Sequence, residues 1–227
     1  MRGFLKTQLL LGLVIVAVGY GLGPRIELDE TIHQVTPPDD LDAYLNESER
    51  RIEGIKPGTE KTIIWADPEQ RQATPYSIVY LHGFSASRQE IAPVCELVAG
   101  TLGANLFYTR LRGHGRDRKA MGELSVNGLL NDAVEALEIG KQLGDTVIVI
   151  GASTGGTLAT WLASYDLSSS IAAVILMSPN FGAKRKESEL MLLPWGNAVL
   201  QLVEGSDYQF QPASDLQQQY WTTRYPS

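Results

Sequence analysis

Hydrophobic residues in the central part of the chain alternate between short continuous runs and helical spacings. Short apolar runs rich in β-branched or aromatic residues predict strands. They fall at residues 61–65, 76–81, 106–109, 146–150 and 171–177. Apolar positions three and four apart predict the intervening helices at residues 88–102, 126–143 and 155–165. Strands that alternate with helices in this way predict an α/β fold with a mostly parallel sheet and helices on both faces.

The first 24 residues follow a different pattern. A continuous apolar run from Leu9 to Leu22 stands behind Arg2 and Lys6. A run of this length approaches the roughly 20 residues that cross a bilayer, while the charge layout also suits a secretory signal peptide. Residues 1–24 are therefore interpreted as a membrane anchor or a signal segment. The predicted location is a bacterial inner membrane, with the body facing the periplasm or exterior, or alternatively export as a soluble protein.

Two further stretches flank the predicted core at residues 61–182. Residues 25–60 form a polar lead-in, where Pro37-Pro38-Asp39-Asp40 is typical of the start of a short helix over residues 42–51. Residues 183–227 begin with helically spaced apolar positions and continue as a polar, aromatic-rich stretch. Because that last stretch contains no strand-like run, we expect neither a strand nor a closing helix there.

The composition is that of a globular protein, with 44% hydrophobic and 20% charged residues. A formal net charge of -7 disfavours a nucleic-acid partner, which requires clustered basic residues. The short basic cluster Lys184-Arg185-Lys186 is interpreted as a solvated loop. The single cysteine, Cys95, excludes an internal disulfide and a multi-cysteine metal site, and its apolar neighbours predict a core position. No metal or organic cofactor is implied, and the oligomeric state stays open.

The segment Gly151-Ala152-Ser153-Thr154-Gly155 matches the G-x-S-x-G pattern of a nucleophile elbow, between a predicted strand and a predicted helix. In such an elbow the chain turns sharply, so that the serine hydroxyl is exposed and side chains at the flanking glycine positions would collide. The helix that follows directs its positive end toward the site, where it favours a developing negative charge. Ser153 is therefore the candidate nucleophile, and Gly151 and Gly155 are the elbow glycines.

A second segment, His82-Gly83-Phe84, follows the strand predicted at residues 76–81. Acyl transfer requires two N–H donors for the oxyanion, of which one follows the nucleophile and the other comes from an earlier loop after a strand. The backbone N–H groups of Thr154 and Phe84 are the candidates. Gly83 has no side chain, so it allows close approach of the backbone.

Four motifs, HGFSAS, RLRGHGRD at residues 110–117, GASTGG and LMSPNF, together resemble the α/β-hydrolase superfamily. The resemblance covers about residues 60–182 and is closest to bacterial carboxylesterases, monoacylglycerol lipases and the serine aminopeptidase-like group. It implies a Ser153 nucleophile, Phe84 and Thr154 as oxyanion donors, and hydrolysis of a carboxylic ester or related acyl compound. A small acyl or lipid-like molecule is the implied substrate. Residues 190–225 would begin a cap over the site.

The same resemblance implies an acid and then a histidine after the nucleophile, because the triad of this fold follows the order Ser, Asp or Glu, His. The three histidines all precede the nucleophile: His33, His82 and His114. His82 and His114 are expected to be structural, and His33 to be solvated. Asp207 and Asp215 are poor candidates for the acid because neither ends a strand-like run.

The chain is therefore expected to lack the triad acid and histidine, together with the last strands and final helix of the fold. We accordingly expect little turnover by this chain alone. One alternative is a non-catalytic, membrane-tethered domain of the same fold. A second alternative is a peptidase or an acyltransferase, because the same elbow serves these reactions and a fold does not identify a reaction. The sequence leaves the acyl chain and the leaving group of the substrate undetermined.

Overall fold

The computed structural model describes residues 2–24, 29–165, 169–182, 193–205 and 207–226. Contacts within the chain divide it into two units, each of which is treated by itself. The core unit comprises the described residues among 29–181 and 209–226. The terminal unit comprises those among 1–28 and 182–208.

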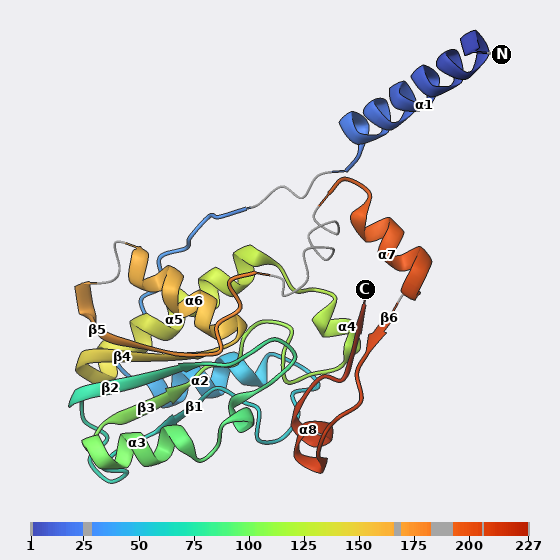
Figure 1. Ribbon diagram of the computed structural model, residues 1–227. Coiled ribbons are helices and arrows are strands. Elements are labelled where there is room, and N and C mark those ends of the chain that lie inside the picture. Colours follow the sequence, from blue (N-terminus) through green and yellow to red (C-terminus); the bar gives the residue numbers. More distant parts are fainter. Residues whose placement is uncertain (1, 25–28, 166–168, 183–192, 206, 227) are drawn as a thin grey trace. The chain divides into compact units, whose positions relative to one another are not determined.

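The core unit is built on a five-stranded sheet (Figure 1). Its strands are β1 (Thr62–Ile64), β2 (Thr74–Leu81), β3 (Asn105–Tyr108), β4 (Gly144–Ala152) and β5 (Ile171–Met177), in the spatial order β1-β3-β2-β4-β5. β2 pairs in parallel with β3 and β4, β4 pairs in parallel with β5, and only β1 is antiparallel to its neighbour. The predicted mostly parallel sheet is therefore confirmed.

Helices cover both faces of this sheet, as predicted. α5 (Val126–Leu143) and α6 (Thr154–Ser164) lie on one face, and α3 (Val94–Leu102) lies on the other (Figure 1). Side chains alternate between the faces along each strand. In β2, Val79 therefore joins the core cluster of α5 and α6, while Ile78 joins the cluster of α3 and Cys95.

The ends of most helices agree with those predicted from the sequence. The side chain of Ser125 caps α5 by accepting a hydrogen bond from the N–H of Gly128 at 3.1 Å. The prediction of one helix over residues 88–102 is wrong in one respect. The segment forms two helices, a short 3-10 helix η1 (Arg88–Glu90) and α3. Pro93 stands at the break, where its missing N–H cannot continue a helical hydrogen-bond ladder.

The lead-in contains α2 (Leu41–Arg50), close to the predicted helix. The side chains of Leu41 and Leu45 are buried in the core cluster on the α5 and α6 face. Glu49 forms a largely buried ion pair with Arg110, with an Oε1–Nη2 distance of 2.8 Å. The lead-in therefore contributes to the core as well as to the polar surface.

The last part of the chain corrects an expectation. Residues 207–226 contain β6 (Asp207–Gln209), α8 (Asp215–Tyr220) and β7 (Arg224–Pro226), although no strand was expected there. Each strand has only three residues, which is too short to produce a recognisable alternation of polar and apolar positions. A further short helix, α4 (Arg118–Met121), follows the loop after β3.

The terminal unit contains two described helices, α1 (Arg2–Leu22) and α7 (Gly196–Glu204). The indole N–H of Trp195, at the start of α7, donates a hydrogen bond to the carbonyl oxygen of Gly19 in α1 at 2.8 Å. Within the described residues, no helix combines the length and apolar character needed to cross a membrane. Membrane attachment through residues 1–24 therefore stays a prediction. The basic cluster at residues 184–186 lies outside the described part of the chain.

Candidate active site

Ser153 occupies a sharp turn between the end of β4 and the start of α6. Its backbone has φ 49° and ψ -114°, a combination that residues with a side chain rarely adopt. The turn is held on both sides: the N–H of Ser153 donates to the carbonyl of Met177 at 2.9 Å, and its own carbonyl accepts from Asn180 at 3.1 Å. The predicted strand–turn–helix geometry is therefore present, and the loop after β5 supports it.

The glycines around Ser153 are required by close backbone approach. A Cβ atom on Gly151 would overlap the carbonyl group of Gly155, and one on Gly155 would overlap the carbonyl group of Leu81 in β2. A third glycine has a similar role, because a Cβ atom on Gly156 would lie 2.9 Å from Cβ of Pro179. Three backbone segments that are distant in the sequence, from β2, the elbow and the loop after β5, thus approach one another closely at these glycines.

The loop after β2 lies directly against the elbow. A Cβ atom on Gly83 would be 3.3 Å from Cβ of Ser153, so only glycine allows this contact without displacement. The sequence predicted close approach at Gly83, and the structure brings the two segments together at that residue.

The orientation of the peptide between Gly83 and Phe84 follows from its hydrogen bonds. The carbonyl oxygen of Gly83 accepts from the N–H of Ala86 at 3.2 Å and contacts Nδ1 of the fully buried His82 at 2.9 Å. C=O and N–H point in opposite directions across a trans peptide, so the N–H of Phe84 points away from this buried side. Within the described residues, neither this N–H nor that of Thr154, the first residue of α6, has a hydrogen-bond partner.

His82 is engaged at both ring nitrogens. Its Nε2 accepts a hydrogen bond from the backbone N–H of Leu111 at 3.0 Å, so Nδ1 carries the proton that is donated to Gly83. Burial, and secondarily the neighbouring ring of His114, holds the pKa of His82 well below 6.5. A neutral imidazole with both nitrogens bonded to the backbone is structural, as predicted, and has no free position to accept a proton from Ser153.

His114 was expected to be structural and His33 to be solvated. Nδ1 of His114 contacts the carbonyl oxygen of Arg112 at 2.9 Å, and burial lowers the pKa of His114 to about 4. Its Nε2 is buried and has no partner within the described residues. His33 is exposed, and its backbone N–H donates to the side chain of Asn131 at 2.7 Å.

The two acid candidates, Asp207 and Asp215, lie in different units. Asp215 is exposed in the first turn of α8. Asp207 belongs to the terminal unit. A different carboxyl group, that of Glu90 in η1, does contact the loop after β2, and sequence reasoning missed it. No signal in the sequence singles it out, because the helix predicted at residues 88–102 also contains Arg88 and Glu96.

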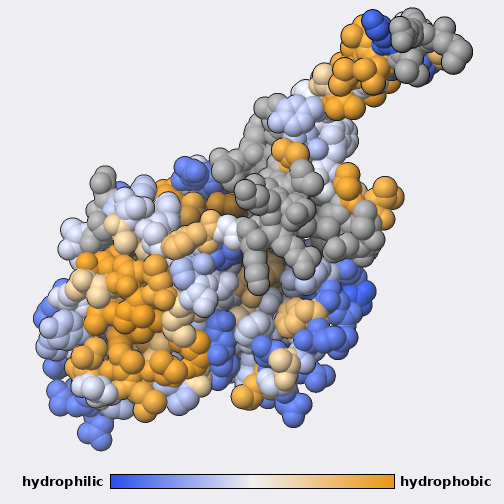
Figure 2. Space-filling view, viewed as in Figure 1, coloured by the Kyte–Doolittle hydropathy of each residue, from blue (hydrophilic) through white to orange (hydrophobic). Residues whose placement is uncertain are grey.

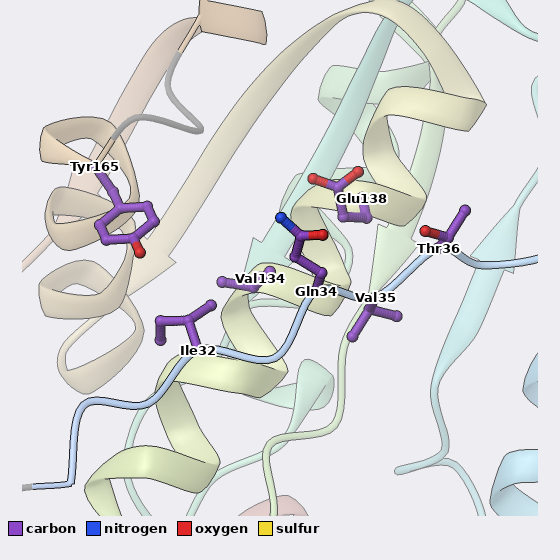
Figure 3. A pocket seen from close by; sticks show the side chains of 7 residues that line it. All are labelled: Ile32, Gln34, Val35, Thr36, Val134, Glu138 and Tyr165. Atoms are coloured by element: carbon purple, nitrogen blue, oxygen red, sulfur yellow. The ribbon is translucent and has the colours of Figure 1, made fainter.

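A pocket of about 350 Å³ lies elsewhere in the core unit, between the extended lead-in and the surfaces of α5 and α6 (Figure 3). Its wall contains no residue of the elbow or of the loop after β2. The carboxylate of Glu138 in this wall is paired with Lys141 at 2.6 Å. The lining residues are Ile32, Gln34, Val35, Thr36, Val134, Glu138 and Tyr165.

The strand–elbow–helix and the glycine-containing loop beside it, carried on a mostly parallel sheet, are the framework of an α/β hydrolase. Residues 76–218 match the model of the family described as alpha/beta hydrolase fold. The chain belongs to this family, and the predicted fold class is confirmed.

The chain is similar to one protein named as a lipase and to solved structures of the same fold. Over 100 residues it is 29% identical to the thermostable monoacylglycerol lipase of Bacillus sp. (strain H-257), which covers 44% of this chain and 40% of that protein. The structure reported for the metagenome-derived lipolytic enzymes LipS and LipT has a TM-score of 0.61 and 17% identity, covering 76% of this chain and 65% of that one. The alpha/beta hydrolase GrgF from Penicillium sp. sh18 has a TM-score of 0.48 and 15% identity, with coverage of 72% and 56%. The chain therefore spans less than two thirds of the length of these relatives.

Proposed function

We propose that this chain carries the nucleophile and the oxyanion donors of a serine hydrolase that cleaves a carboxylic ester or a related acyl substrate. The observation that carries the proposal is the backbone of Ser153, held at φ 49° between β4 and α6 with Gly83 packed against its Cβ atom. Strained serine residues of this kind persist where the surrounding structure over-determines them, and they cluster at active sites.

The proposed reaction proceeds through an acyl-enzyme. Oγ of Ser153 attacks the substrate carbonyl carbon and its proton passes to a base, which leaves negative charge on the former carbonyl oxygen. The N–H groups of Phe84 and Thr154 donate to that oxygen, and the N-terminal end of α6 adds a favourable dipole. The intermediate then collapses with protonation of the leaving group, and water releases the acyl group by the same steps.

A lipid-like acyl ester is the substrate class we favour. The lipase name of one relative and the lipolytic activity named for another support this choice. The ring of Phe84 is 39% exposed and meets the ring of Tyr225 edge-on, with 4.9 Å between centroids. An apolar wall next to a proposed oxyanion donor suits an acyl chain better than a charged group. A peptidase or acyltransferase on the same elbow is the alternative reaction.

The test is covalent labelling of Ser153 by p-nitrophenyl acetate. Because His82 has no free ring nitrogen, the assay is run with and without imidazole in the buffer as an external base. We expect little labelling without imidazole, and an acetyl group on Ser153 with it, detected by mass spectrometry of the digested protein. Ser153→Ala is the control. Because imidazole itself releases p-nitrophenol from the ester, the acetylated peptide is the readout, and labelling at other residues only would refute the proposed nucleophile.

A non-catalytic role is the second candidate, and the engagement of both nitrogens of His82 favours it. A domain of this kind would bind acyl compounds without turnover. It predicts no acetylated Ser153 at any imidazole concentration, together with saturable binding of a fatty-acid ester by calorimetry.

For the location of the protein, we propose attachment to a membrane through residues 1–24, supported by the apolar run behind Arg2 and Lys6. The full chain should then fractionate with bacterial membranes and be released by detergent but not by salt. A released product that begins near Tyr20 would instead establish a cleaved signal peptide.

A further inference from the structure

A largely buried carboxyl group lies behind the loop that contains Gly83. Oε1 of Glu90 accepts two hydrogen bonds, from the backbone N–H of Gly83 and from the hydroxyl of Tyr80, both at 2.6 Å. Hydrogen bonds to a carboxyl group are strong when the group is shielded from water. Burial raises the pKa of Glu90.

The partners of Glu90 are themselves rigid. The ring of Tyr80 is fully buried in β2 and meets the ring of Tyr108 edge-on, with 5.8 Å between centroids. The short helix η1 returns the chain toward the loop, because the N–H of Glu90 donates to the carbonyl of the buried Ser87 at 3.1 Å. The carboxyl group therefore reaches back seven residues to the N–H of Gly83 and ten residues to the hydroxyl of Tyr80.

Two successive peptide groups of the loop are held by hydrogen bonds. The peptide between His82 and Gly83 is held through its N–H by Glu90, and the peptide between Gly83 and Phe84 is held through its C=O by Nδ1 of His82 and the N–H of Ala86. A glycine has no side chain to restrict its backbone, so these bonds fix the two peptides on either side of it. With both in place, the direction of the Phe84 N–H is set.

We propose that Glu90 is a positioning residue that fixes the loop supplying the Phe84 oxyanion donor. The inference rests on the proposed hydrolase function, because only acyl transfer makes the direction of that N–H important. Glu90 acts through its hydrogen-bond acceptor and has no contact with the reacting atoms.

The negative charge of Glu90 has no part in this role. A Cβ atom on Gly83 would lie 3.1 Å from Oε2 of Glu90 and 3.3 Å from Cβ of Ser153, so the carboxyl group and the elbow both lie next to Gly83. A negative charge near a developing oxyanion disfavours it, so the charge offers no catalytic advantage. Glutamine keeps the accepting oxygen and removes the charge, so Glu90→Gln should retain the function and Glu90→Ala should lose it.

The first measurement is the rate of Ser153 acetylation by p-nitrophenyl acetate with imidazole, on the full chain. Displacement of an oxyanion donor slows acyl transfer by roughly 10- to 100-fold. We therefore expect the acetylation rate of Glu90→Ala at saturating ester to fall by that factor, while the half-saturating ester concentration changes by less than about 3-fold. Glu90→Gln should remain within about 3-fold of wild type or exceed it. Glu123→Ala, at an exposed glutamate, is the matched control and should have no effect.

The second measurement is amide hydrogen exchange at Gly83, which does not depend on turnover. The Gly83 amide should exchange slowly in wild type and in Glu90→Gln, and quickly in Glu90→Ala. The amide of Val79, in the preceding strand β2, should stay protected in all three. Unchanged protection of Gly83 in Glu90→Ala would overturn the proposal. So would equal slowing of acetylation by the glutamine and alanine variants, since the charge would then be the active feature. Absence of acetylation in wild type would refute the hydrolase function, and the exchange data would still decide the role of Glu90 in the loop.

Discussion

Replacement of Ser153 by glycine should stabilise the fold while it removes the proposed nucleophile. At φ 49° and ψ -114° a residue with a Cβ atom is strained by about 1–3 kcal/mol. Glycine adopts this conformation freely, although its greater freedom in the unfolded chain returns about 0.4–1 kcal/mol. The net gain in the free energy of unfolding is therefore about 1.3 kcal/mol, within limits of about 0 and 2.6 kcal/mol. For a chain of this size each kcal/mol corresponds to about 2–4 °C in Tm.

The matched control is Ser153→Ala, measured by urea unfolding followed through tryptophan fluorescence. Alanine keeps the Cβ atom and hence the strain, and the Ser153 side chain makes no capping hydrogen bond that alanine would lose. The alanine variant should therefore unfold within about 0.5 kcal/mol of wild type. A glycine variant no more stable than the alanine variant would show that the elbow stores no strain.

Three further predictions concern other parts of the core unit. Gly155→Ala forces a Cβ atom into a backbone carbonyl and should lower the free energy of unfolding in urea by about 3 kcal/mol or more. Gly100→Ala, on the open surface of α3, should instead raise it by about 0.5–1 kcal/mol, and similar values for both variants would contradict the steric argument. The pKa of His114 is lowered to about 4, so acidification from pH 6.5 to 4 protonates this residue only in the unfolded chain and costs about 1.4 kcal/mol of stability per pH unit. Burial raises the pKa of Asp132 to about 6, so its protonation below pH 6 favours the folded chain and offsets part of this loss. Asp132→Asn should therefore lose stability more steeply below pH 6 than wild type, and parallel profiles would contradict this. Ile175→Lys on the exposed edge strand β5 should reduce self-association in light scattering. A wild-type chain that is already monodisperse at the same concentration would contradict this prediction.

The strands of the sheet were predictable because each contains a short continuous apolar run. β5 occupies residues 171–177 as predicted, and β4 extends the predicted run at both ends. The amount of cover over β5 was not predictable, because half-exposed side chains such as Ile175 and Leu176 have the same sequence pattern as buried ones. Figure 2 shows hydrophobic side chains gathered on the surface in the part of the view occupied by β5 and α3.

Some features of the candidate site depend on residues that are neighbours in the sequence, and others depend on contacts between distant segments. The elbow was predictable because its steric demands fall on residues within two positions of Ser153. The supporting contacts of Glu90 and Asn180 were not, because they join loops that only the folded sheet brings together. A polar side chain seven residues beyond Gly83 has no periodic pattern that would distinguish it from a solvated one.

The bonding of His82 has a consequence for kinetics. Its ring is neutral and keeps both backbone partners well below the pH at which a free imidazole takes up a proton. The peptide that presents the Phe84 N–H is therefore oriented identically on both sides of neutrality. A pH–rate profile of acyl transfer by this protein will report the ionisation of whichever base serves Ser153, and an added imidazole will impose its own titration curve on the rate.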